Sequence, residues 1–176
     1  MASIMSVGLP VLFFLSLYGT FYLEIEYYFD KLFYASEIPE IAGLDTSYPE
    51  FNYELRDFGR IWVLNYTLLF IAALALVNIK ILKNRVLGIA SLIIGALAAF
   101  LFLTEGLYIL SELRQSFLNE DLSSYGTSTF NIGIRYISLV FFALLLFALF
   151  RLSKATFMRV NLKIPFEFVL HISILW

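Results

Sequence analysis

Three residues of one predicted helix carry the side chains best suited to chemistry in this sequence. Glu105, Tyr108 and Glu112 are spaced three and four residues apart, so a helix places them on one face. Two carboxylates beside a phenol could bind a sugar, a cation or a basic partner. A membrane enzyme acting on lipid or glycan would need these groups, or groups beyond Trp176, for its chemistry. The favoured interpretation is simpler: the acidic side chains keep their segment in water.

The single histidine, His171, lies in an apolar run, where an ionisable side chain is by default a functional candidate. Its nearest carboxylate, Glu167, is four residues earlier, and one such pair is too few for a metal site with three or four ligands. The chain has no cysteine, which excludes disulfides, zinc–thiolate sites and thiol nucleophiles. No catalytic triad or glycine-rich phosphate loop can be argued from the spacings. We therefore predict no catalytic residue, no metal and no cofactor in this segment, and a histidine hydrogen-bonded within a helix bundle.

A row of small residues recurs at helical spacing in the third apolar stretch of the chain. Its members are Gly88, Ser91, Gly95 and Ala99. Small residues let helix backbones approach closely, which favours association where lipid removes the hydrophobic contribution. The row could join two copies of the chain. Packing against the second or fourth apolar stretch of the same chain is the favoured interpretation.

Two asparagines lie in the second apolar stretch, Asn65 near its outer end and Asn78 near its inner end. An amide that faces a membrane bundle can hydrogen-bond to a neighbouring helix, a contribution of about 0.6–2 kcal/mol. Asn65 also begins an Asn-Tyr-Thr glycosylation pattern, but its depth in the membrane argues against modification. We therefore assign both amides to packing.

Apolar helices must hold all of these residues. The chain is 61% hydrophobic and 15% charged, whereas soluble domains average about 45–50% and about 25%. About 20 helical residues cross the hydrocarbon layer, and backbone amides in lipid need partners within their own segment. We predict an all-α polytopic transmembrane bundle over residues 1–163, with two helical hairpins. Its four spans are 4–23, 61–79, 86–104 and 132–152.

The charged residues between the spans predict the orientation of the chain. Residues 80–85 include three basic residues and no acid, and four more basic residues lie at or after the end of the fourth span, from Arg151 to Lys163. The other two connections, 24–60 and 105–135, hold nine and four carboxylates. Because basic segments stay in the cytoplasm, we predict a cytoplasmic amino terminus and extracytoplasmic acidic segments. A secretory signal peptide at the start would need a basic n-region, which the sequence lacks.

The closing residues 164–176 are predicted to begin a further membrane helix. Pro165 suits the first turn of a helix, and an apolar run follows it. Eleven helical residues rise only about 16 Å, roughly half the hydrocarbon thickness. The chain is therefore expected to be a fragment of a longer protein, with an interfacial amphipathic tail as the alternative.

Three segments together resemble a known family: LEIEYYFDKLFYAS, RDFGRIWVLNYTLLF and FEFVLHISILW. They look like the later part of a bacterial family of long multi-pass membrane proteins, catalogued as domain of unknown function 2339. That family has no assigned catalytic residues, so the resemblance carries none over. It implies a part of a large inner-membrane protein with many spans in hairpin repeats.

The expected function is that of a non-enzymatic scaffold or interaction module in the bacterial cell envelope. The alternative is part of a multi-pass transporter or channel, although ionisable groups near the membrane midplane, usual in a transport path, are missing from spans two and three. The expected partners are the lipid bilayer and further helices of a longer parent chain or of other membrane subunits. No nucleic-acid partner is expected.

Overall fold

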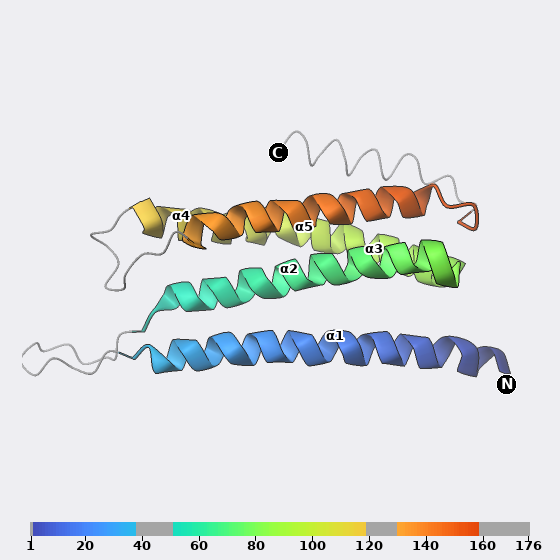
Figure 1. Cartoon of the computed structure of the whole chain (residues 1–176), viewed down its shortest axis with the longest axis horizontal. Coiled ribbons are helices and arrows are strands. Elements are labelled where there is room, and N and C mark those ends of the chain that lie inside the picture. The colour runs from blue at the N-terminus through green and yellow to red at the C-terminus, as the bar shows by residue number, and fades with distance from the viewer. Residues whose placement is uncertain (1, 38–50, 119–129, 159–176) are drawn as a thin grey trace, which may run out of the picture. The chain divides into compact units, whose positions relative to one another are not determined.

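The structure is a computed structural model that describes residues 2–37, 51–118 and 130–158 (Figure 1). These residues are helical apart from short turns, and they contain no strand. The predicted all-α fold is therefore confirmed for this part of the chain. The elements are α1 (Ala2–Ala35), α2 (Tyr53–Val77), the π-helix η1 (Asn78–Leu82), α3 (Arg85–Leu101), the π-helix η2 (Phe102–Gly106), α4 (Leu107–Leu118) and α5 (Phe130–Ser153).

Among the described residues, three helices are long and apolar enough to cross a membrane. They are Tyr53–Leu82, Arg85–Leu118 and Phe130–Ser153, and they contain the predicted spans 61–79, 86–104 and 132–152. The first predicted span, 4–23, lies in α1, which is not among the three. The fourth crossing therefore stays a prediction.

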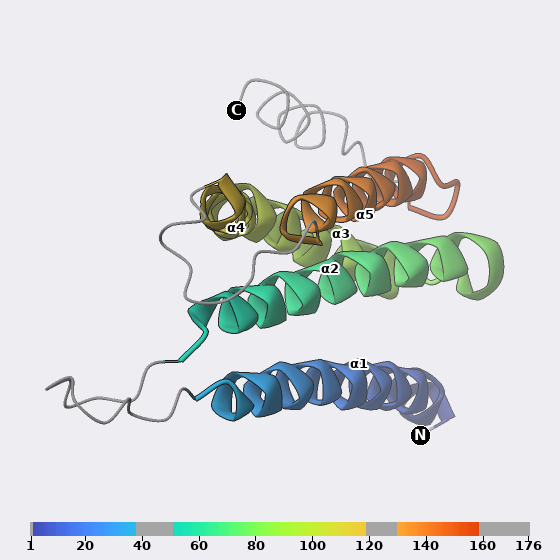
Figure 2. The same cartoon turned by 60° about the vertical axis from the view of Figure 1, so that its left-hand side comes forward.

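The contacts divide the chain into two units, Met1–Val63 and Leu64–Trp176, and the division falls inside α2. In the second unit α5 runs antiparallel to the continuous helix formed by α3, η2 and α4, and it contacts both α3 and α4 (Figure 2). Phe102 of η2 stacks on Phe142 of α5, with ring centroids 4.7 Å apart. Both rings are buried and belong to the core of this unit.

The π-helix η2 lies inside a continuous helix rather than at its end. Such segments contain more residues per turn than an α-helix and are frequent at functional sites. Gly106, its last residue, is buried, and a Cβ there would lie 2.8 Å from a Leu64 Cδ. A side chain at Gly106 would therefore require the end of the Leu64 side chain to shift.

Two asparagine side chains fix the connection between η1 and α3. Asn78 Nδ2 donates to the Asn84 carbonyl oxygen (3.0 Å), and the Asn84 amide donates back to Asn78 Oδ1 (2.9 Å). Asn84 Oδ1 accepts hydrogen bonds from the amides of Val86 and Leu87, so it caps the first turn of α3. Lys83 between them has a left-handed backbone, with φ 47°, and its amide donates to the Asn78 carbonyl. The turn is therefore held by its own side chains.

Candidate functional site

The predicted cluster of Glu105, Tyr108 and Glu112 lies on the outside of η2 and α4. All three side chains are exposed, and 65% of the surface of Tyr108 is accessible to solvent. No hydrogen bond or ion pair joins these side chains to another described residue. The helix buries its opposite face, which includes Gly106 and Ile109. The three groups therefore lie on an open surface of the helix.

The small residues of α3 lie on its buried side. The four are Gly88, Ser91, Gly95 and Ala99, all of which are buried within the chain. A Cβ at Gly95 would lie 2.8 Å from both Cδ atoms of Leu149 on α5. At Gly88 it would lie 2.5 Å from Met158 Sδ, just after α5. These glycines therefore allow close packing against α5 and the turn that follows it.

The two asparagines of the second apolar stretch have different environments. Asn78 is fully buried and bonds to Asn84 across the turn, not to a neighbouring helix. Asn65 is also fully buried, but neither its side-chain nitrogen nor its oxygen has a hydrogen-bond partner among the described residues. A buried amide without partners costs about 1–3 kcal/mol. His171 and Glu167 lie outside the described residues.

In the first unit, an aromatic cluster and the hydrogen bonds of two polar side chains connect the end of α1 to the start of α2. The Phe33 ring stacks on Phe51 with centroids 5.0 Å apart. Ser36 Oγ donates to the Phe33 carbonyl (2.6 Å) and accepts from the Asn52 amide (3.0 Å). Asn52 Oδ1 in turn accepts from the Glu54 amide (3.0 Å), which caps α2. These contacts set how α1 and the first turns of α2 face each other.

The two helices of this unit approach closely at Gly59. A Cβ there would lie 2.9 Å from the Cβ of Phe29. The close contact between the two helices therefore depends on glycine, which has no side chain, at this position. Two open cavities lie between α1 and α2 in this region, and Phe29 lines both of them.

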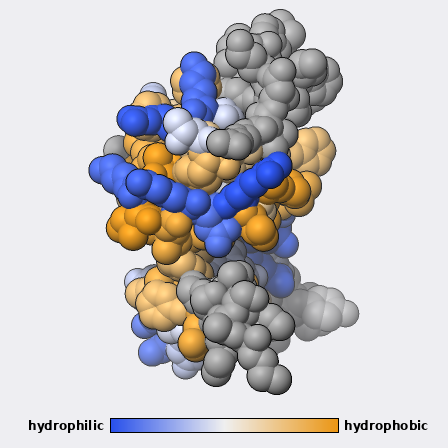
Figure 3. Space-filling view, turned by 90° about the vertical axis from the view of Figure 1, so that its right-hand side faces the viewer, coloured by the Kyte–Doolittle hydropathy of each residue, from blue (hydrophilic) through white to orange (hydrophobic). Residues whose placement is uncertain are grey.

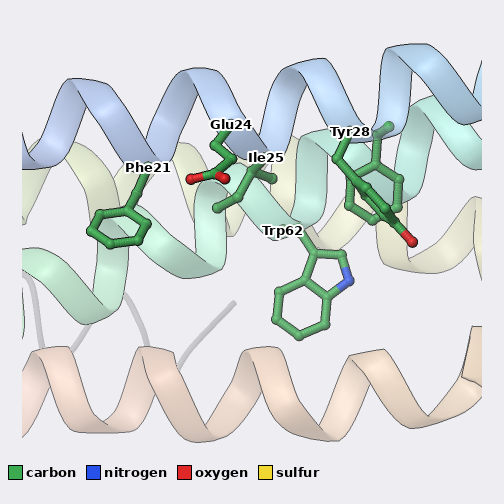
Figure 4. A pocket seen from close by; sticks show the side chains of 6 residues that line it. Phe21, Glu24, Ile25, Tyr28 and Trp62 are labelled. Atoms are coloured by element: carbon green, nitrogen blue, oxygen red, sulfur yellow. The ribbon is translucent and has the colours of Figure 1, made fainter.

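The first cavity is apolar and has a volume of about 440 Å³. Figure 4 shows Phe21, Glu24, Ile25 and Tyr28 along α1, and Trp62 on α2. Glu24 is the one charged side chain that lines it. The cavity is lined by Phe21, Glu24, Ile25, Tyr28, Phe29 and Trp62.

The second cavity is polar and has a volume of about 300 Å³. It is lined by Tyr22, Glu26, Phe29, Asp30, Arg56, Gly59, Arg60 and Val63. Two carboxylates four residues apart come from α1, and two guanidinium groups four residues apart come from α2. One turn of helix separates the members of each pair, so both members lie on one face.

The charges that line the polar cavity do not neutralise one another. Arg60 Nη1 lies 3.9 Å from Asp57 Oδ1 on the same helix, and Arg60 keeps 57% of its side-chain surface exposed. The Arg56 guanidinium lies 5.7 Å from the centroid of the Phe33 ring. Within the described residues, neither Glu26 nor Asp30 forms an ion pair. The cavity therefore presents separate negative and positive sides, a feature that the sequence did not predict.

Basic side chains collect at the end of the second unit where α2 and η1 end, α3 begins and α5 ends. Figure 3 looks at this end and shows hydrophilic side chains between hydrophobic ones. Lys154 Nζ lies 3.9 Å from the centroid of the Phe150 ring, and the Arg151 guanidinium 5.8 Å from that of Phe147. Such stems covering apolar rings are typical of basic residues at a membrane boundary. The exposed basic residues here are Lys80, Lys83, Arg85, Arg151 and Lys154.

No family model matches this chain, and no curated protein or solved structure was found to match it. The described residues also contain no group of three or more histidine, cysteine, aspartate or glutamate side chains that could hold a metal ion. The resemblance to the bacterial membrane family therefore stays a hypothesis.

Proposed function

We propose that this chain is a scaffold or interaction module in the bacterial inner membrane, without enzymatic activity of its own. The main support is the incomplete burial of its apolar helices. The most apolar stretches of the three long helices are only 33–39% buried by the chain itself. The outer side of α3 exposes Ile93, Leu97 and Phe100, each more than half accessible. Surfaces of this kind need lipid or further membrane helices to cover them.

The proposal includes a fourth crossing by residues 4–23 of α1 and a cytoplasmic amino terminus. The acidic segments 24–60 and 105–135 then lie outside the cell, and the basic end of the second unit lies inside. The support is the separation of charges along the sequence, together with the aromatic rings beneath Arg151 and Lys154. The resemblance to the bacterial family adds that the chain belongs to a longer protein with more spans.

A second candidate is part of a transporter or channel, and two observations favour it. The π-helix η2 interrupts the regular backbone of a membrane helix. The unpartnered amide of Asn65 lies in the apolar part of another helix. Polar groups and irregular backbone inside a membrane protein often mark a transport path.

A double substitution separates the two candidates. For a scaffold, Glu105→Ala with Glu112→Ala should leave unchanged the size of the assembly that contains this chain, because both side chains are exposed and bond to no described residue. Blue native electrophoresis of mildly solubilised membranes measures that size. In proteoliposomes, the original chain should not accelerate the decay of proton, sodium, potassium or chloride gradients beyond that of empty vesicles.

The transporter candidate makes the opposite prediction. The chain in proteoliposomes would dissipate at least one of these gradients, and the double substitution would abolish the flux. A chain that migrates alone in native membranes and conducts ions would contradict the scaffold proposal.

A further inference from the structure

The two cavities of the first unit lie at one level of the proposed topology. The outer ends of the first two spans are residues 23 and 61, and both cavities are lined by residues close to these positions. Trp62 and Tyr28 in the apolar cavity and Tyr22 in the polar cavity are residue types that favour the headgroup region. The cavities therefore lie where the hydrocarbon of the outer leaflet meets its headgroups.

The charges that line the polar cavity are complementary to the two charges of a zwitterion. Arg56 and Arg60 form its cationic side, and guanidinium groups are well suited to phosphate because they offer several parallel N–H donors. Glu26 and Asp30 form its anionic side, and carboxylates accept hydrogen bonds from a primary ammonium group. An anion alone would meet the carboxylates, and a cation alone would meet the arginines. A ligand with both charges satisfies both sides.

The apolar cavity explains why the ligand should be an amphiphile. It shares Phe29 with the polar cavity, and all but one of its lining residues are aromatic or aliphatic. A hydrocarbon chain beside this surface removes apolar area from contact with the headgroup region. A soluble zwitterion would leave this surface uncovered.

We propose that the first unit binds one outer-leaflet phospholipid with a primary-amine zwitterionic headgroup, phosphatidylethanolamine. Its phosphate lies against Arg56 and Arg60, and its ammonium group lies against Glu26 and Asp30. Part of an acyl chain lies along the apolar cavity beside Trp62. This inference rests on the proposed membrane topology and adds a lipid partner to it.

Quenching of tryptophan fluorescence by brominated lipids tests the proposal in the full chain. Trp176→Phe leaves Trp62 as the single tryptophan of the two in the sequence. The protein is reconstituted in phosphatidylcholine vesicles that contain a small, fixed mole fraction of one lipid brominated in its acyl chains. Brominated phosphatidylethanolamine should quench Trp62 more than brominated phosphatidylcholine or phosphatidylglycerol. Two solvent-exposed charge contacts correspond to a preference of about threefold to tenfold in relative association constant.

Paired substitutions assign this preference to the polar cavity. Glu26→Gln with Asp30→Asn should reduce quenching by phosphatidylethanolamine to the level of phosphatidylcholine and should increase quenching by phosphatidylglycerol. Arg56→Gln with Arg60→Gln should also abolish the preference, without an increase for phosphatidylglycerol. The matched control is Glu105→Gln with Glu112→Gln, which removes two exposed carboxylates elsewhere on the same proposed side and should keep the preference.

The possible outcomes distinguish failure of the lipid site from failure of the proposed membrane topology. Equal quenching by the three lipids at the same mole fraction, or loss of the preference in the control, would overturn the lipid site alone. Loss of the preference on adding glycerophosphoethanolamine at the same concentration would also overturn it, because the site would then recognise a soluble headgroup. Absence of quenching in vesicles made entirely of brominated lipid would overturn the membrane position of Trp62 as well.

Discussion

Gly95→Leu should lower the free energy of unfolding by about 2 kcal/mol, because it overpacks the contact between α3 and α5. A Cβ at this position would already lie 2.8 Å from both Cδ atoms of Leu149, and a leucine adds three further carbons. Leu149 is itself buried, so it has little room to move. Unfolding by sodium dodecyl sulfate in mixed micelles, followed by circular dichroism, measures the change.

Gly133→Ala on α5 is the matched control. Apart from its chain neighbours and the backbone of its own helix, no described atom lies within 4 Å of a Cβ built at Gly133, so alanine fits there. It should stabilise the protein by about 0.5–1 kcal/mol, because alanine has a higher helix propensity than glycine. If Gly95→Leu were neutral while it reduced the size of an oligomer, the glycine face would join two copies of the chain, and the packing described above would be wrong.

Substitution of leucine for each of the two buried asparagines of the second long helix should change the free energy of unfolding in opposite directions. Asn78→Leu should destabilise the protein by about 2–3 kcal/mol, because it removes two part-buried hydrogen bonds and leaves the backbone amide of Asn84 without this partner. The same unfolding titration in mixed micelles measures this loss. An effect below the error of the titration would show that the turn does not depend on Asn78.

Asn65→Leu should stabilise the protein by about 1–2 kcal/mol. Both polar atoms of this side chain are buried without a partner, so an apolar side chain of similar size removes a cost and no bond. Asn65→Ala, which removes the amide but leaves a cavity, is the control for packing and should give less stabilisation than leucine. Destabilisation by Asn65→Leu equal to that of Asn78→Leu would instead show that Asn65 binds water or a ligand, as the transporter candidate requires.

The long helices could be predicted from the sequence because membrane helices have a local signature. Uncharged runs such as 86–104 satisfy a length requirement set by the bilayer, whatever their neighbours are. The packing role of Gly95 was also among the alternatives, because small residues at helical spacing mark one face of a helix. Its partner, Leu149, could not be named, since the spacing within α3 contains no information about α5.

The features that the sequence did not reveal depend on contacts between segments. Glu26 and Arg60 are far apart in the chain, and the docking of Gly59 on Phe29, with the contacts at the end of α1, brings their helices around one cavity. The spacing of four residues within each charged pair was visible, but without this docking it indicated only a solvated helix face. The bond between Asn78 and Asn84 was missed for another reason: both residues flank a basic turn, and the amides were assigned to helix packing.

We propose that the acidic and basic connections lie on opposite sides of a membrane that the chain crosses four times. Because the chain has no cysteine, single cysteines can report each side without a background. Suitable exposed positions are Glu37→Cys, Glu112→Cys, Lys83→Cys and Lys154→Cys. A membrane-impermeant maleimide applied to intact spheroplasts should label the first two, and it should label the other two only after permeabilisation. Labelling of Lys83→Cys and Glu112→Cys from the same side would contradict the account.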